Sequence, residues 1–159
     1  MAARESPTNR LDLAAYRINY GGTRIQMKTR TLSLQTASSK FVDLTSELER
    51  FVSAARDGLL SVFVPHATAG VAVIETGSGS EDDLEQALNR LLPRNQTYVH
   101  SHGSPGHGAD HVIPAFISPS VTIPVVGGAL QLGTWQSVVL VDLNKDNPRR
   151  QVYLSFLEG

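Results

Sequence analysis

Apolar and polar residues alternate along several short segments of the chain, and helical spacing appears in only two. Residues 25–34 alternate loosely, as in a half-buried strand. Residues 59–65 and 70–75 are short β-branched runs that predict two strands around a turn at 66–69. Later apolar runs are separated by Gly, Asn and Pro, which favour turns. These runs predict strands at residues 121–125, 129–132, 135–143 and 151–157.

Two segments have the spacing of amphipathic helices. Within residues 43–56, Leu44, Leu48 and Phe51 recur every three or four positions. Residues 80–92 follow a Ser-x-x-Asp capping pattern, carry acidic groups in the first turn and stop at a proline. Since the strands do not alternate regularly with helices, the sequence predicts an α+β fold with an antiparallel or mixed sheet.

Length and composition predict one globular domain. Of the 159 residues, 41% are hydrophobic and 18% are charged. We expect residues 1–22 to form a flexible N-terminal arm, and residues 23–159 to form the domain. The arm is locally basic without interleaved aromatic residues, which is typical of a solvated segment.

Charge and cysteine content exclude several classes. A formal net charge of −1 argues against nucleic acid as a partner. The sequence has neither a signal-peptide pattern nor a long apolar run, so we expect no membrane contact and a cytoplasmic location. Because there is no cysteine, any bound metal must be held by nitrogen and oxygen ligands.

Four of the five histidines fall between residues 100 and 111, in a Gly-rich stretch, and the fifth is His66 at a predicted strand end. Imidazole is the commonest metal ligand and titrates near neutrality, so the set indicates a metal or acid–base site. His100 and His111 are the strongest pair because each adjoins a predicted ordered segment. His100 closes a predicted strand at residues 97–100, and His111 follows Asp110, which could cap the short apolar stretch 112–117. His102 and His107 lie in the Ser/Gly/Pro interior and are expected to be bystanders. Solvated loop histidines are the alternative.

Other residues could complete a site. Glu75 ends a predicted strand and could act as a base or orient a ligand, or be an ordinary surface residue. Thr68 lies two positions from His66 and could face the same cleft. An arginine turned into that cleft would suit a phosphate. The residues that could contact substrate are Thr68, Thr134, Trp135, Gln136, Arg149 and Arg150.

Taken together, the motifs resemble the YjbQ family, the secondary thiamine-phosphate synthase enzyme family. The resemblance covers residues 23–159 and rests on HATAGVAVIE, YVH, ADHV, TIPVVGGALQLGTWQ and the arginine pair before the last strand. It implies a compact α+β sandwich that assembles as a homotrimer. It also implies that His66, His100 and His111 are the family's histidines, placed where a divalent metal (Zn²⁺ or Mg²⁺) can bind, and that Glu75 matches the family's glutamate. Ile74 stands where the family has asparagine.

The resemblance implies a transferase reaction. The enzyme would join a pyrimidine methyl diphosphate to a thiazole phosphate and release pyrophosphate. Glu75 and His66 would be catalytic, and the arginines and Trp135 would bind a phosphorylated small molecule. Two alternatives stay open: a metal-dependent small-molecule hydrolase or lyase, and a non-catalytic trimer that binds a metal or ligand.

Overall fold

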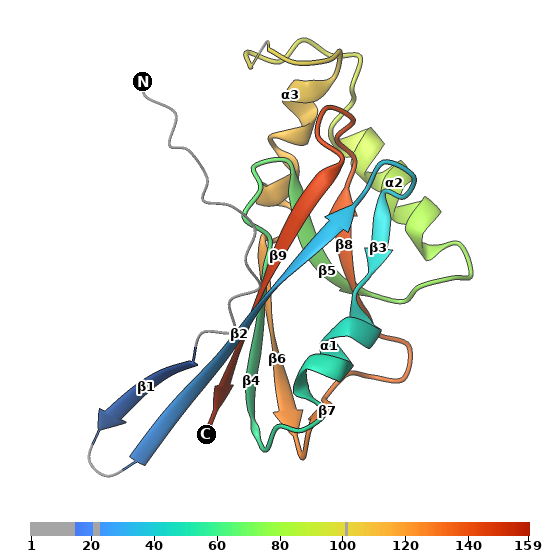
Figure 1. Cartoon of the computed structure of the whole chain (residues 1–159). Helices are drawn as coiled ribbons and strands as arrows, with labels where there is room; N and C mark the ends of the chain where they lie inside the picture. The colour runs from blue at the N-terminus through green and yellow to red at the C-terminus, as the bar shows by residue number, and fades with distance from the viewer. Residues whose placement is uncertain (1–14, 21–22, 101) are drawn as a thin grey trace, which may run out of the picture.

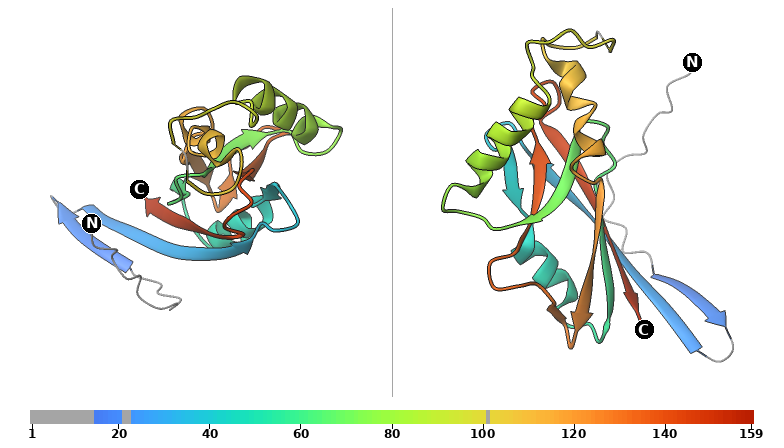
Figure 2. Two further views of the ribbon diagram at one scale, coloured as in Figure 1. Left: turned by 90° about the horizontal axis from the view of Figure 1, so that it is seen from above. Right: turned by 180° about the vertical axis from the view of Figure 1, so that it is seen from behind.

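The computed structural model describes residues 15–20, 23–100 and 102–159. Its strands form two antiparallel sheets (Figure 1). The larger sheet has the strand order β1-β2-β9-β4-β6-β7. Its members are β1 (Ala15–Tyr20), β2 (Thr23–Gln35), β4 (Gly58–Phe63), β6 (Ser120–Val126), β7 (Ala129–Leu130) and β9 (Arg149–Glu158). β1 lies inside the predicted arm and pairs with β2 in a hairpin that projects from the body (Figure 2). The boundary between arm and domain stays a prediction.

The smaller sheet has the order β3-β8-β5, with β3 (Phe41–Asp43), β5 (Ala69–Ile74) and β8 (Ser137–Asp142). The main core lies between the two sheets, since it combines side chains such as Leu60 and Leu154 of the larger sheet with Val71 and Leu140 of the smaller one. The predicted α+β sandwich is therefore confirmed.

Strand β8 is buried on both faces. Leu140 faces the main core, whereas Val141 belongs to a second apolar cluster beneath the helices. This explains why the segment is a continuous apolar run rather than an alternating one. The run ends in two buried polar residues, Asp142 and Asn144, which both contribute to the site described below.

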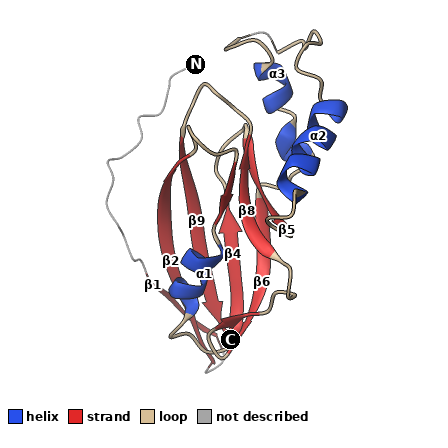
Figure 3. Ribbon diagram, turned by 90° about the vertical axis from the view of Figure 1, so that its right-hand side faces the viewer, coloured by secondary structure: helices blue, strands red, loops and turns tan. Residues whose placement is uncertain are grey.

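The helices occupy opposite ends of the sandwich (Figure 3). α1 (Thr45–Val52) is shorter than the predicted helix and packs its Leu48, Phe51 and Val52 into the main core. α2 (Ser80–Leu91) and α3 (His107–Asp110) belong to the other end, with the 3₁₀ turn Ile113–Ala115. α2 has the predicted bounds to within one residue. Its cap is Gly79, and Glu81 accepts the Gly77 N–H, so the predicted serine cap is wrong.

The outward face of the larger sheet is apolar at its centre. Leu59 and Phe63 of β4 are opposite Leu157 and Tyr153 of β9, and all four are more than 40% exposed. Ser61 and Ser155 form the row between these two pairs, so the centre of the face has no charged group on β4 or β9. On other proteins, large exposed apolar patches commonly serve as contact surfaces.

Among the described residues, no helix is both long and apolar enough to cross a bilayer. The cytoplasmic location stays a prediction.

Candidate metal centre

Four histidines converge at the end of the molecule that carries α3. His100, His102, His107 and His111 each offer a ring nitrogen, and these atoms all lie within 4.8 Å of one another. Their ring centroids are 4.0 to 5.7 Å apart. The structure brings His100 and His111 together, as expected. It also brings His102 and His107, which were expected to be bystanders, into the same cluster. Which of the four histidines bind a metal stays a prediction.

The chain is folded tightly around α3. Gly108 has no room for a side chain, since a Cβ there would lie 2.5 Å from Tyr98 Cβ and 2.9 Å from the His100 carbonyl oxygen. This close approach brings the segment before residue 100 against α3, and with it His100. Residues 97–100 were expected to form a strand, but no strand is present there. The loop reaches the cluster through packing on α3 instead.

His107 and His111 are spaced by one helical turn at α3. Their Nε2 atoms lie 2.9 Å apart. His107 is buried, at 8% exposure, and its other ring nitrogen, Nδ1, lies 2.6 Å from the Asp146 carboxylate. Asn144 Nδ2 lies 3.1 Å from the same Nδ1. The turn that follows β8 therefore fixes the His107 ring through contacts of Asp146 and Asn144 with its Nδ1 atom.

Electrostatics favour the neutral form of two histidines in the cluster, His111 and His100. Burial lowers the pKa of His111, and the neighbouring His100 lowers it further. The pKa of His100 is lowered in the same way, first by desolvation and then by His102. The pKa of Asp146 is lowered chiefly because its carboxylate accepts the Ser104 N–H. A neutral imidazole is the form that binds a metal ion, so these shifts favour metal binding at neutral pH.

The donor set fits a transition metal. Four imidazole nitrogens suit Zn²⁺, Cu²⁺ or Ni²⁺, whereas Mg²⁺ and Ca²⁺ take oxygen ligands. A cavity of about 280 Å³ adjoins the cluster and is lined by His100, His102 and His107, with Tyr98 and residues 103–106 among its walls. His100 and His102 are exposed, so the cluster is open to solvent on that side.

His66 lies apart from the cluster, contrary to the expectation that it is a metal ligand with His100 and His111. Its Nε2 accepts the Gln151 N–H at 2.8 Å, so this nitrogen has no free lone pair for a metal. Burial, and then the charge of Arg150, lower the pKa of His66. His66 faces a second cavity of about 460 Å³, whose walls include Arg149, Gln151 and Asn147.

The predicted residues Thr68 and Arg150 do lie beside His66, but they form a buried network. Arg150 donates from Nε and Nη2 to the Asp142 carboxylate at 2.6 and 2.9 Å, and from Nη2 to Thr68 Oγ1 at 3.0 Å. Asp142 also accepts the Thr36 hydroxyl and the Asn144 N–H. With its guanidinium engaged in this way, Arg150 supports the fold, and Arg149 is the exposed arginine at the cavity.

Asn144 joins this network to the histidine cluster. Its side-chain nitrogen donates to Asp110 Oδ2 at 2.9 Å and lies beside His107. Asp110 forms an ion pair with Arg94, which also donates to the Leu143 carbonyl at 3.0 Å. The predicted role of Asp110 as a helix cap is wrong, because it is the buried last residue of α3.

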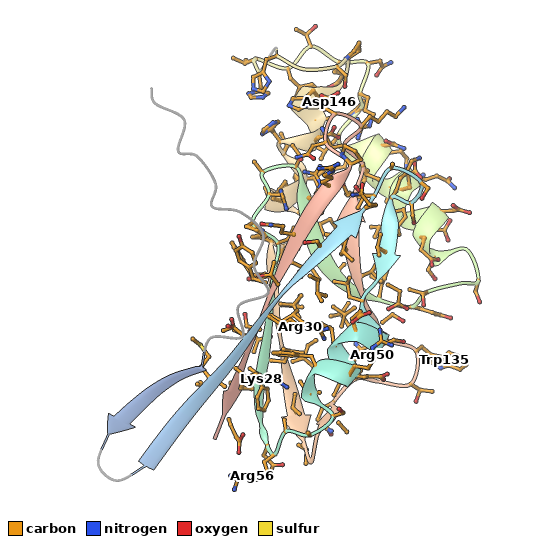
Figure 4. All side chains as sticks on the ribbon, in the orientation of Figure 1. Lys28, Arg30, Arg50, Arg56, Trp135 and Asp146 are labelled. Atoms are coloured by element: carbon orange, nitrogen blue, oxygen red, sulfur yellow. The ribbon has the colours of Figure 1, made fainter. Side chains whose placement is uncertain are left out.

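The remaining predicted site residues lie at the other end of β8. Ile74 pairs with Ser137 at one end, and Ala69 pairs with Asp142 at the other. At a rise of about 3.3 Å per residue, these ends are roughly 17 Å apart. Glu75 therefore lies at the end away from the histidines, as do Thr134, Trp135 and Gln136. Figure 4 shows Trp135 and Asp146 far apart in this way.

Residues 133–136 form a turn before β8 rather than the expected strand start. The Gln136 side chain accepts the Gly133 N–H at 2.8 Å, and Trp135 is 73% exposed. Within one chain, this group and Glu75 do not meet the histidines.

Sequence reasoning missed His107, Asp110, Asn144 and Asp146. The four-residue spacing of His107 and His111 was the available signal, because residues so spaced share one face of a helix. Asn144 and Asp146 gave no such signal, since they follow β8, which is distant in sequence from the histidines. Asp110 gave none either, because its partners Arg94 and Asn144 are also distant in sequence.

Comparison with known proteins identifies relatives of this architecture. Residues 30–159 match the family described as UPF0047 protein YjbQ-like. A UPF0047 protein of Mycobacterium tuberculosis is 63% identical over 84% of this chain and all of its own length. One from Archaeoglobus fulgidus is 32% identical over 76% of this chain and 95% of its own length.

Solved structures agree with the fold. A YbjQ-like protein of unknown function from Sulfolobus solfataricus superposes with a TM-score of 0.79 at 23% identity, covering 85% of this chain and 99% of its own. A hypothetical protein from Aeropyrum pernix gives 0.74 at 32% identity, covering 82% and 98%. The chain is thus a member of the YjbQ-like UPF0047 family.

Proposed function

We propose that the chain binds one divalent transition metal at His100, His102, His107 and His111 and acts there on a small phosphorylated molecule. The observation that carries this proposal is the convergence of four ring nitrogens within 4.8 Å. Bringing imidazoles this close has an electrostatic cost for their charged forms, and the pKa of His111 is lowered by burial and by the neighbouring histidines. Such an ion would supply Lewis-acid assistance to a bound substrate.

Two features support a reactive site over a purely structural one. His107 is buried and held by Asp146, whereas His100 and His102 are exposed beside the 280 Å³ cavity. A substrate in this cavity could therefore take the place of an exposed histidine, while the buried side of the cluster stays fixed. Structural metal sites, in contrast, have every position closed by protein.

The specific reaction implied by the resemblance is thiamine-phosphate synthesis. That reaction needs cationic groups on a diphosphate leaving group. Arg149 is the first residue of β9, which follows the turn that carries Asp146, and it is exposed at the 460 Å³ cavity. Its guanidinium could bind a phosphate bidentately.

A metal-dependent hydrolase or lyase is the second candidate, and the donor set favours it. Diphosphate-dependent synthesis usually relies on Mg²⁺, which takes oxygen ligands, whereas imidazoles suit Zn²⁺. Glu75 is too far from the histidines to be their base within one chain. A non-catalytic role would require all four histidines to bind the ion at once, with no position open to substrate.

We also propose that the chain self-associates through the apolar face formed by Leu59, Phe63, Tyr153 and Leu157. The number of subunits, three, comes from the family resemblance. In such an assembly Glu75 and Trp135 of one subunit could approach the histidines of another. The two groups of predicted site residues, which lie far apart within one chain, would then form one site between subunits.

An activity assay tests the proposed reaction. Purified protein is supplied with the pyrimidine methyl diphosphate and the thiazole phosphate, with Zn²⁺, Mn²⁺ or Mg²⁺, beside a His107→Ala/His111→Ala variant. Thiamine phosphate formed by the wild type and lost in the variant supports the synthase. If there is no product in any metal, but phosphate esters are hydrolysed with the same dependence on the histidines, the second candidate is correct.

A further inference from the structure

We propose that Asp146 is a positioning residue of the histidine cluster: its carboxylate fixes the tautomer of His107, so that Nε2 presents a lone pair to the other histidines. The consequence for metal binding rests on the proposed function. The assignment of the His107 tautomer does not depend on the proposed function.

The contacts at His107 Nδ1 decide which tautomer is present. Asp146 Oδ2 lies 2.6 Å from this nitrogen, and Asn144 Nδ2 lies 3.1 Å from it. A ring nitrogen of neutral imidazole either donates or accepts, and a carboxylate only accepts. The short contact to Asp146 therefore requires the proton on Nδ1. Asn144 has Asp110 Oδ2 as an acceptor at 2.9 Å, so its amide does not need to donate to His107.

The proton on Nδ1 leaves Nε2 as the unprotonated nitrogen. This atom points into the cluster, 2.9 Å from His111 Nε2. Metal-binding histidines usually donate their other N–H to a carboxylate or carbonyl group, which sets the ring orientation and raises the basicity of the ligating nitrogen. The pair Asp146 and His107 has this arrangement.

Asp146 is itself held in place from both sides. Its Oδ2 accepts the Ser104 N–H at 3.1 Å, and its own N–H donates to Asn144 Oδ1 at 3.0 Å. One carboxylate thus ties the histidine loop to the turn that follows β8. Because Asp146 lies outside the ligand set, its effect on the cluster passes through His107.

The tautomer can be observed without any metal. Long-range ¹H–¹⁵N spectra of the chelator-treated, ¹⁵N-labelled full chain at about pH 8.5 report neutral rings, since this is well above the ordinary histidine pKa. A His107→Gln protein assigns the signal. We expect His107 to be protonated on Nδ1 in the wild type and in Lys145→Ala, a control from the same turn. In Asp146→Ala, Asn144 is the remaining neighbour and donates to Nδ1, so the proton moves to Nε2.

Two results would overturn this assignment: an Nε2-protonated His107 in the wild type, or an unchanged Nδ1–H in Asp146→Ala. The wild-type spectrum alone is decisive if Asp146→Ala does not fold.

Metal titration tests the effect of Asp146 on metal affinity. With Zn²⁺ against a competing chelator, Asp146→Ala should bind roughly 10- to 100-fold more weakly than the wild type, as for other lost outer partners of ligating histidines. An exposed acidic residue on α2 gives the matched control, Asp82→Ala, which should bind Zn²⁺ as the wild type does. Equal affinity in Asp146→Ala and wild type refutes the positioning role and leaves the metal site standing. A wild type that binds no Zn²⁺ refutes the metal site, whereas the tautomer result stands by itself.

Discussion

His107 is the first residue of the four-residue helix α3 and His111 is its C-cap, and their Nε2 atoms lie 2.9 Å apart. The more deeply buried of the two, His107, contacts the Asp146 carboxylate through its other ring nitrogen. Two ring nitrogens at this separation share one proton or one ion. The contact makes these two residues the fixed part of the cluster, with His100 and His102 on the exposed loop completing it.

The buried Arg150–Asp142 pair should dominate the stability of this end of the molecule. Removing one partner leaves an uncompensated buried charge, so Asp142→Asn should lower the free energy of unfolding by about 3–5 kcal/mol. Arg149→Ala, at the adjacent exposed position, should change it by about 0.5 kcal/mol or less. Urea denaturation measures both. Equal effects would show that Arg150 does not depend on Asp142.

Stability should fall in mild acid, partly because of His66. Its pKa in the folded protein lies below the ordinary value of 6.5, mainly through burial. Between these two pKa values the unfolded chain binds more protons than the folded chain, so stability rises with pH and is lost as pH falls below 6.5. Thermal melts from pH 7.5 to 5 should show a smaller loss in His66→Gln than in the wild type. The variant keeps a hydrogen-bond acceptor for the Gln151 N–H, and identical pH profiles would contradict the account of His66.

The apolar sheet face should mediate self-association. A charge at its centre would be buried without a partner, so Phe63→Glu should dissociate the assembly into monomers, as measured by light scattering. Leu91→Glu is the matched control, because Leu91 is an exposed leucine on α2, away from this face. A monomeric wild type, or equal dissociation by both variants, would argue against this interface.

Elements with a strong local pattern were predictable from the sequence. α2 has an apolar face and a terminating proline, and β8 has a continuous apolar run, so both were predicted close to their observed positions. Trp135 and Gln136 were predicted to begin this strand, because an apolar tryptophan continues the apolar run, but they belong to the turn before β8. The turn is held by a side-chain hydrogen bond of Gln136 to Gly133, which hydrophobic periodicity cannot reveal.

The site was predictable only in part. The concentration of histidines pointed to the right region, but His107 was set aside because a Ser/Gly/Pro segment favours loop structure. That segment forms α3 because Gly108 packs against Tyr98 and Asn144 bonds to Asp110, contacts between residues far apart in sequence. The expectation that His66 joins His100 and His111 differs from the structure for the same reason. Its hydrogen bond from the Gln151 N–H depends on how β9 passes the end of β4, which is a contact between residues distant in sequence.

Metal analysis of untagged protein tests the central claim most directly. We predict about one transition metal ion per chain in the wild type after incubation with Zn²⁺, in keeping with a single four-ligand site. His66→Ala should retain the metal, because this residue lies outside the cluster, and His107→Ala/His111→Ala should lose it. Metal retained by the double variant, or no metal in the wild type after incubation, would contradict the account.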